Sequence, residues 1–167
     1  ALRTSDGSVA WRSQNETLTH STPVLATLQG VRQLIFATLS GLIALDPLTG
    51  ARLWGCNYTF TYNPLYALAV SPVVNQDMVF MTGTRSVSYG SFVRRVTFAN
   101  NVWTTTQLWS AADPSSTFTT AVARDGFLYG TFGYDNPQNE FKCVNMRTGA
   151  VKWSQAGFGR SGLLMVD

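Results

Sequence analysis

Apolar and polar residues alternate along most of this chain with the short period that is typical of β-strands. Runs rich in Val, Ile, Phe, Tyr and Thr, such as residues 33–38, 77–81 and 125–129, are separated by Gly, Asn, Asp and Pro. The alternation predicts strands with one face in a core, and the breakers predict turns between them. The sequence indicates no amphipathic helix of useful length, so we expect an all-β fold.

An eleven-residue phrase recurs at residues 1–11, 44–54 and 143–153. Each copy has a small residue first, an apolar residue second, Gly seventh and Trp eleventh, and the last two copies share Thr-Gly-Ala. A phrase repeated at intervals of tens of residues is typical of solenoids and propellers, in which each unit buries its face only against its neighbours.

Each phrase is expected to form a hairpin that ends on its tryptophan. Gly7, Gly50 and Gly149 stand where the turn favours a positive φ, which glycine adopts at little cost. Asp46 can accept a hydrogen bond from the backbone two residues further on, as Asp and Asn do in turns.

A second recurring element precedes the phrases, at residues 21–24, 70–73 and 119–122, and again near 161–164. It is followed by a turn and an apolar strand, and a third strand then leads into the phrase and its hairpin. Four strands in a unit of about 45 to 50 residues are typical of a propeller blade.

The repeat predicts where the blades begin and end. Whole blades are expected at residues 18–54, 65–109 and 118–153. Residues 1–11 would be the last strand of a preceding blade, and residues 159–167 the first strand of a following one. Because propellers usually close with about four to eight blades, the chain is expected to be a partial propeller.

The phrase at residues 44–54 reads Ala-x-Asp-x-x-Thr-Gly-x-x-x-Trp, which resembles the pyrroloquinoline-quinone (PQQ) type of β-propeller repeat. Such repeats occur in quinoprotein alcohol dehydrogenases and in many non-catalytic propellers, including a lipoprotein of the outer-membrane β-barrel assembly machinery. The resemblance implies that Trp11, Trp54, Trp109 and Trp153 dock between adjacent blades. A ring in that position buries on the order of 150 to 250 Å².

Composition and charge exclude some partners. Charged residues make up 13% of the chain, well below the roughly 25% of an average soluble domain, which suits an extracellular or periplasmic β-protein. The net charge is +3 and the only adjacent basic pair is Arg94-Arg95, so no basic stripe for nucleic acid is predicted. No apolar run approaches the roughly 18 residues that a membrane span needs.

The reactive residues have structural interpretations. His20 is the only histidine, which excludes a catalytic triad or an imidazole cluster within the chain. Cys143 occupies the small-residue position of a phrase, so a buried strand thiol is favoured over a bridge to Cys56. The acids in repeat turns or before second strands are interpreted as turn residues: Asp6, Asp46, Asp77 and Asp125. The glycine-rich stretch at 157–162 is interpreted as the approach to the next blade, because it lacks a P-loop ending.

Two further features concern the surface. Asn15 and Asn57 lie in sequons and are candidate glycosylation sites if the source is eukaryotic and secretory. Residues 85–90 and 133–139 interrupt the repeat with polar and aromatic side chains, and are the places where specific contacts are expected.

The sequence therefore favours a non-catalytic binding or scaffolding module, extracellular or periplasmic, without cofactor, catalytic or metal-binding residues in this segment. Its expected partner is a protein, a glycan or the remainder of its own propeller. The alternative is a fragment of a quinoprotein dehydrogenase that oxidises an alcohol or a sugar. In that case PQQ and Ca²⁺ would be bound outside the segment. A calcium ion near the quinone is held by carboxylate and amide oxygens, with an aspartate as general base, and the acids named above are interpreted as turn residues.

Overall fold

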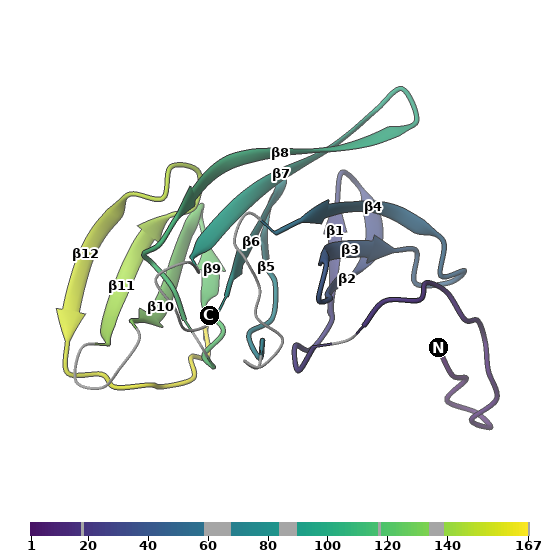
Figure 1. Cartoon of the computed structure of the whole chain (residues 1–167), viewed down its shortest axis with the longest axis horizontal. Helices are drawn as coiled ribbons and strands as arrows, with labels where there is room; N and C mark the ends of the chain where they lie inside the picture. Colours follow the sequence, from purple (N-terminus) through teal and green to yellow (C-terminus); the bar gives the residue numbers. More distant parts are fainter. Residues whose placement is uncertain (18, 59–67, 84–89, 117, 134–138, 167) are drawn as a thin grey trace.

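The computed structural model describes residues 1–17, 19–58, 68–83, 90–116, 118–133 and 139–166, and these form strands and turns without a helix. Their strands make three four-stranded antiparallel sheets (Figure 1). The first sheet contains β1 (Val24–Leu28), β2 (Val31–Ala37), β3 (Gly41–Leu45) and β4 (Arg52–Asn57). The second contains β5 (Val73–Asn75), β6 (Met78–Thr82), β7 (Ser91–Ala99) and β8 (Val102–Ala111). The third contains β9 (Val122–Arg124), β10 (Phe127–Phe132), β11 (Glu140–Asn145) and β12 (Val151–Ala156).

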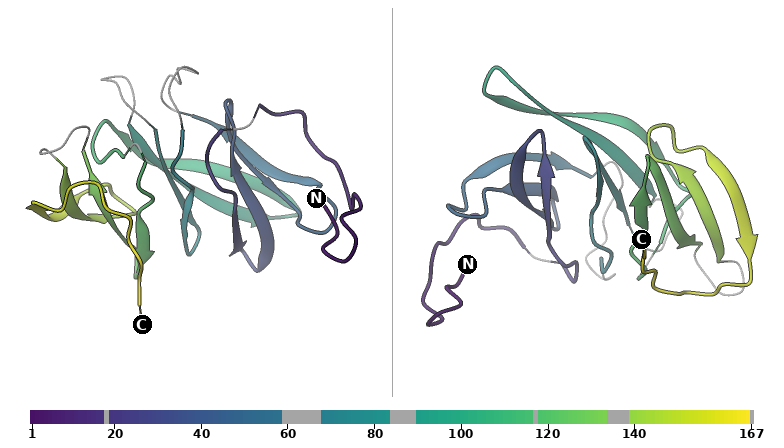
Figure 2. Two further views of the ribbon diagram at one scale, coloured as in Figure 1. Left: turned by 90° about the horizontal axis from the view of Figure 1, so that it is seen from below. Right: turned by 180° about the vertical axis from the view of Figure 1, so that it is seen from behind.

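Each sheet is a meander in which strands that follow one another in the chain are also neighbours in the sheet. The strands β4, β8 and β12 therefore lie at one edge of their sheets. Figures 1 and 2 show the sheets arranged in chain order, each turned relative to the one before. The predicted all-β fold of four-stranded antiparallel blades is confirmed.

Two-residue turns join the first and second strands of each sheet. Gln29-Gly30, between β1 and β2, has φ angles of 52° and 75°, and Asp125-Gly126, between β9 and β10, has 50° and 82°. Turns with two positive φ angles match the right-handed twist of the strands that they connect. Asp77 lies in the corresponding turn between β5 and β6, which agrees with the interpretation of Asp77 and Asp125 as turn residues.

The core consists of two apolar seams, one between each pair of adjacent sheets. On β6, Val79 and Met81 face the first sheet, whereas Met78 and Phe80 face the third. Every residue of β6 is buried as a result, and its sequence is almost continuously apolar. The largest fully buried side chain of the first seam is Phe92. The stability of each sheet thus depends on its neighbours.

The two ends of the chain lie outside the three sheets. Residues 1–11 form a short hairpin with a single antiparallel bridge between Leu2 and Val9. The described residues after β12 form no strand. A first strand needs a second strand as its partner, so the assignment of 159–167 to a following blade stays a prediction, as does that of 1–11 to a preceding one.

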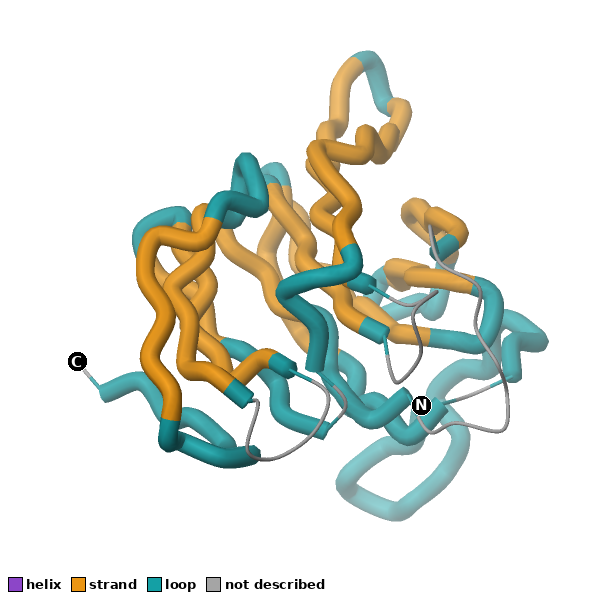
Figure 3. The backbone as a smooth tube through the Cα atoms, turned by 60° about the vertical axis from the view of Figure 1, so that its left-hand side comes forward, coloured by secondary structure: helices purple, strands orange, loops and turns teal. Residues whose placement is uncertain are grey.

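The second sheet differs from the others in the length of its last hairpin. Its strands β7 and β8 have nine and ten residues, whereas β3, β4, β11 and β12 have five or six. The distal half of this hairpin projects beyond the body of the sheets (Figures 2 and 3). Its turn, Asn100-Asn101, has φ angles of 52° and 60°, which asparagine adopts more easily than most residues.

Removing the ring of Phe80 should destabilise the seam between the second and third sheets. Its side chain is 1% exposed and lies 6.1 Å from the ring of Trp109 and 6.3 Å from that of Phe132. We expect Phe80→Ala to lower the free energy of unfolding by about 3 to 5 kcal/mol. Leu25→Ala, at a position that is 45% exposed, is the control and should cost far less in urea denaturation. Equal losses would contradict the two-seam core.

Candidate functional site

The three copies of the phrase fold into the same hairpin. In each copy the seventh residue, glycine, donates its N–H to the carbonyl of the third residue, and the third donates its N–H to the carbonyl of the eighth. The glycine bonds are Gly7 to Arg3 (2.9 Å), Gly50 to Asp46 (2.9 Å) and Gly149 to Asn145 (2.8 Å). All three glycines have φ between 72° and 76°. The hairpin at 1–11 is therefore the same structural unit as those that end the first and third sheets.

The side chain of Asp46 fixes its turn from inside. Its Oδ1 accepts the N–H groups of Leu48 at 2.7 Å and Thr49 at 2.9 Å. These two bonds, that of Thr49 first, hold the pKa of Asp46 below its ordinary value because they stabilise the carboxylate. Asn145 makes the same pair of bonds in the third sheet.

The first hairpin is capped differently, because Arg3 occupies the position of Asp46. There Asp6 Oδ1 accepts the N–H of Ser8 at 2.9 Å, and this bond lowers the pKa of Asp6. In the second phrase the same position holds Thr49, whose Oγ1 accepts the N–H of Ala51 at 3.2 Å. Asp6 thus takes the role that threonine has there. Both carboxylates that occur in phrases are engaged with backbone.

A β-bulge precedes the final tryptophan of each sheet. The register shifts between Ala44 and Leu45, between Val93 and Arg94, and between Cys143 and Val144. The extra residues on the fourth strands are Leu53, Leu108 and Lys152. A bulge bends and twists its strand locally, and here it sets the direction of the tryptophan that follows.

Trp11 and Trp109 sit on the phrase hairpin of the next sheet. Trp11 Nε1 donates to the carbonyl of Pro47 at 3.1 Å, and Trp109 Nε1 donates to that of Met146 at 2.8 Å. Pro47 and Met146 hold the same position in their phrases. This bond satisfies the one polar group of the indole as the ring packs between sheets.

The phrase glycines lie directly beneath these two rings. A Cβ added to Gly50 would come within 2.5 Å of the Trp11 ring, and one added to Gly149 within 2.9 Å of the Trp109 ring. Glycine at this position therefore serves two purposes: it provides the positive φ of the turn, and it leaves room for the tryptophan that packs on the hairpin. We call this arrangement of indole, glycine and carbonyl the tryptophan seat.

Trp54 docks in another way, because the second sheet ends in the long β7–β8 hairpin and not in a phrase. Its side chain is 5% exposed and its Nε1 donates to Gln33 Oε1 at 2.6 Å, within its own sheet. Gln33, which is fully buried, donates in turn to the carbonyl of Leu28 at 3.3 Å. Gln33 was not identified from the sequence, where nothing distinguishes it from other strand glutamines.

Trp153 has no seat among the described residues. Its side chain is 44% exposed, and its ring centroid lies 5.3 Å from that of Phe141 and 6.3 Å from that of Tyr129. Phe158, 46% exposed, adds a further ring 5.2 Å from Phe141. We call these four rings the aromatic face of the third sheet. At the other end of the chain, a Cβ added to Gly7 would meet nothing within 4 Å.

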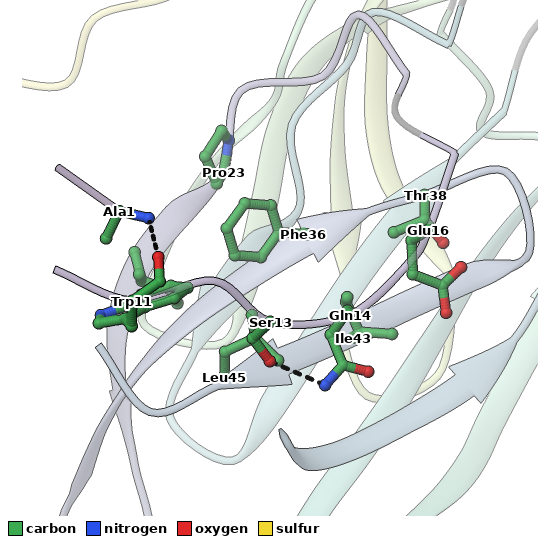
Figure 4. A pocket seen from close by; sticks show the side chains of 11 residues that line it. Ala1, Trp11, Ser13, Gln14, Glu16, Pro23, Phe36, Thr38, Ile43 and Leu45 are labelled. Carbon is green, nitrogen blue, oxygen red and sulfur yellow. Dashed lines mark hydrogen bonds between the residues drawn. The ribbon is translucent and has the colours of Figure 1, made fainter. Parts of the chain in front are cut away.

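A cavity of ≈ 410 Å³ lies on the outward face of the first sheet (Figure 4). Leu34, Phe36, Ile43 and Leu45 of β2 and β3 line it together with Trp11. Ser13, Gln14 and Glu16 form its polar side, where Ser40 Oγ donates to Glu16 Oε2 at 2.7 Å. The lining is predominantly apolar and contains a single carboxylate.

Other acids in the described part of the chain form ion pairs. Arg95 contacts Asp77 at 2.9 Å, and Lys142 contacts Asp113 at 2.7 Å and Glu140 at 3.4 Å. Hydrogen bonds from Ser154 and then from Lys142 lower the pKa of Glu140. Within the described ranges no three His, Cys, Asp or Glu side chains gather where they could hold a metal ion.

The two cysteines are free, in agreement with the sequence-based preference for thiols over a bridge. Cys143 is buried on β11. Burial raises the pKa of the Cys56 thiol, and the nearby Arg94 only partly offsets this effect. A thiol that is held protonated is a poor nucleophile.

The remaining predicted positions lie at the surface or outside the described residues. His20, Asn15 and Asn57 are exposed, and His20 lies outside the strands. Most of the two segments in which specific contacts were expected, 85–90 and 133–139, falls outside the described residues. In the described part of the chain, no helix is long and apolar enough to cross a membrane.

Comparisons with known proteins agree with this architecture. A family model described as outer membrane protein assembly factor BamB matches residues 1–155. BamB from Moraxella catarrhalis superposes with a TM-score of 0.58 at 20% sequence identity, over 89% of this chain and 40% of that chain. A europium-containing methanol dehydrogenase gives a TM-score of 0.46 at 11% identity, over 85% of this chain and 36% of that chain. No curated protein matches the sequence.

The likeness to the Moraxella structure shows the fold, and with it the predicted β-propeller and its PQQ-type repeat are confirmed. The chain spans well under half the length of either solved structure.

The tryptophan seat can be tested with a matched pair of glycines. Gly50 and Gly30 both have φ near 74°, but a Cβ at Gly30 meets nothing within 4 Å. Both alanine variants should lose roughly 1 to 2 kcal/mol to the left-handed conformation. Gly50→Ala should lose about 1 to 3 kcal/mol more, because the methyl group displaces the Trp11 ring. Thermal and urea unfolding would measure the difference, and equal losses would show that the seat contributes nothing.

Proposed function

Since the chain belongs to the family described as outer membrane protein assembly factor BamB, we propose that it is part of a β-propeller that binds other proteins as a non-catalytic scaffold. The match to residues 1–155 is the observation that carries the proposal. The name of the family points to a partner among the proteins that assemble outer membrane proteins. A glycan partner has no support of this kind.

The residues of the described structure support a binding role over a catalytic one. The acids of the phrases are bonded to backbone, Asp77 and Asp113 are in ion pairs, and the pKa of Cys56 is raised. A catalytic site usually contains titratable groups with perturbed pKa values that converge on a cleft. The cavity on the first sheet presents one carboxylate, Glu16, beside an apolar wall.

Further blades on both sides of the three sheets form part of the proposal. Ala44 and Trp54 of the first sheet are covered by the second sheet, whereas the equivalent Cys143 and Trp153 of the third sheet belong to its outward side. The aromatic face would therefore receive a following blade. The cavity beside Trp11 would receive the inner strands of a preceding blade, whose final hairpin is residues 1–11. Under this proposal the whole blades are residues 18–54, 65–109 and 118–153, and residues 159–167 begin the next.

We place the protein in the periplasm or outside the cell. The low content of charged residues, 13%, and the family description both support this location.

In the full-length protein, Trp153 should be as important for stability as Trp109. If a following blade covers the aromatic face, Trp153→Ala should lower the free energy of unfolding by about 3 to 5 kcal/mol. The variant would lose a buried indole and leave a cavity in its place. The matched control is Trp109→Ala, which removes the indole from the tryptophan seat at Gly149. A loss below about 1 kcal/mol for Trp153→Ala alone would contradict a following blade.

The scaffold function should be visible in the assembly of outer membrane proteins. We expect loss of the full-length protein in its native host to lower the level of folded outer membrane β-barrels, measured by heat-modifiability in gels. Wild-type protein should restore that level, whereas a fold-disrupting Phe80→Ala should not. Unchanged β-barrel levels would contradict the proposal. So would a dehydrogenase activity with an artificial electron acceptor after addition of PQQ and Ca²⁺, since it would favour the quinoprotein alternative.

A further inference from the structure

The β7–β8 hairpin carries a structural element that the other two sheets lack. Ahead of the bulge at Leu108, six consecutive residues of β8, 102–107, pair regularly with residues 94–99 of β7. In β4 and β12 the bulge comes at the second residue of the strand, so no regular stretch precedes it. This extra ribbon projects beyond the body of the sheets (Figures 1 and 3).

One face of the ribbon is anchored to the first sheet. Val96 is fully buried in the first seam, and Gln29 Nε2 donates to its carbonyl at 3.2 Å. Trp103 packs against the same seam, and its ring lies 4.5 Å from that of Phe98. The ribbon is thus held in a defined position and keeps its other face and its outer edge open.

The direction of the backbone groups at that edge follows from Val96. Its N–H donates to the carbonyl of Asp77 at 2.8 Å and its own carbonyl accepts from Gln29, so both groups point away from β8. The pair Val96–Thr105 is therefore not hydrogen-bonded, and the N–H and C=O of Thr105 point outward. By the alternation of antiparallel strands, the same groups of Trp103 and Gln107 also point outward.

The outer edge of β8 is paired with no strand in the described structure. Native proteins usually protect such edges with charges, proline or an early bulge. The fourth strands of the other sheets have both charge and an early bulge, with Arg52 in β4 and Lys152 in β12. The strand β8 contains neither a charged residue nor proline. Its first six residues therefore present an unprotected edge of good β-formers.

We propose that this edge pairs antiparallel with the β8 edge of a second copy of the protein, about a two-fold axis that passes midway between the Thr105 residues of the two copies. Only registers in which outward-pointing residues face one another form hydrogen bonds, and the register centred on Thr105 satisfies this condition. It places Thr105 opposite Thr105 and Trp103 opposite Gln107, with about six backbone hydrogen bonds between the strands. Centring on Thr104 would allow only about four.

The composition of β8 favours a second copy as the occupant. A two-fold axis pairs the strand with its own copy, so a charged strand would bring two like charges to the same short interface, as Arg52 or Lys152 would in β4 or β12. The strand β8 meets only Trp, Thr and Gln. Threonine pairs across a sheet are favourable, and within the ribbon Thr97 Oγ1 already lies 2.6 Å from Thr104 Oγ1.

The projection of the ribbon gives the two copies room to pair. Thr105 pairs with Val96 in the half of the hairpin nearer its turn, and this half of the hairpin projects beyond the body of the sheets (Figure 2). Two copies would join into one continuous eight-stranded sheet, and the tip of each ribbon would reach towards the base of the other. The pairing uses neither the aromatic face nor the cavity beside Trp11, so it is independent of the proposed scaffold function and of its partner.

Thr105→Pro tests the pairing without disturbing the hairpin. Proline removes the outward N–H of Thr105, whereas the bonds to β7 come from Thr104 and Thr106, and edge positions whose N–H faces solvent tolerate proline. In sedimentation equilibrium the full-length wild-type protein should be a dimer at about tens of micromolar, and Thr105→Pro should raise the dissociation constant at least about tenfold. Thr104→Lys, at an exposed side chain, should weaken the dimer in a salt-dependent way.

A covalent trap tests the register. Residues opposite one another in a hydrogen-bonded antiparallel pair have Cα atoms about 5.5 Å apart, which lies within the range of a disulfide. Thr105→Cys should form a disulfide-linked dimer under mild oxidation, and the wild type, in which Cys56 and Cys143 lie outside β8, should not. A wild-type monomer at all concentrations, a dimer that survives Thr105→Pro, or an edge that takes up only a foreign strand would each overturn the proposal.

Discussion

The packing of a tryptophan against the glycine hairpin of the next sheet is the contact on which this architecture depends. Each sheet has two apolar faces and cannot bury both alone, so the structure exists only as a stack. The seat fixes how the second sheet stacks on the third and how the hairpin at residues 1–11 stacks on the first sheet. Trp11 on Gly50 and Trp109 on Gly149 use the same three elements: a ring, a residue without a side chain and a free carbonyl. Because the carbonyl is four residues into the phrase and the glycine seven, a sheet that slid along its neighbour would lose both contacts.

The second sheet shows what happens when the seat is absent. The β7–β8 hairpin has no phrase glycine, and Trp54 finds its hydrogen-bond acceptor in Gln33 of its own sheet. Burying a side-chain amide as the acceptor costs free energy unless the amide forms a further hydrogen bond. Gln33 does so by donating to the carbonyl of Leu28. The seam is completed instead by Val96 and Trp103 of the ribbon, which lean over the first sheet. In the second sheet the ribbon therefore takes the place that the phrase hairpin has in the other two sheets.

These contacts explain what could and could not be predicted from the sequence. The phrase residues could be predicted because their roles require particular residue types. Gly50 is needed for its positive φ and because it leaves room for an indole, and Asp46 is needed to hold its turn. The acceptors of the indole bonds were not visible, because any residue has a carbonyl, and here Pro47 and Met146 provide it. Gln33 was missed for a related reason, since its role arises only when the next sheet lacks a phrase. The projection of the ribbon could not be predicted either. The alternation of apolar and polar residues indicates strands, but it does not indicate how far a hairpin extends beyond its sheet.

A repeat protein of this kind separates the residues that make the fold from those that can give it a specific role. Positions that recur between the first and third sheets are occupied by the seat and the turn, and a change at any of them affects the packing of a seam. Specific contacts must therefore come from positions at which one sheet departs from the others. In the described structure the largest departure is the ribbon of the second sheet, whose inner face is used for anchoring and whose outer edge is open. A contact that is identical in each blade cannot distinguish one blade or one partner from another. A single uncharged edge, held in position by Val96 and Trp103, can make that distinction.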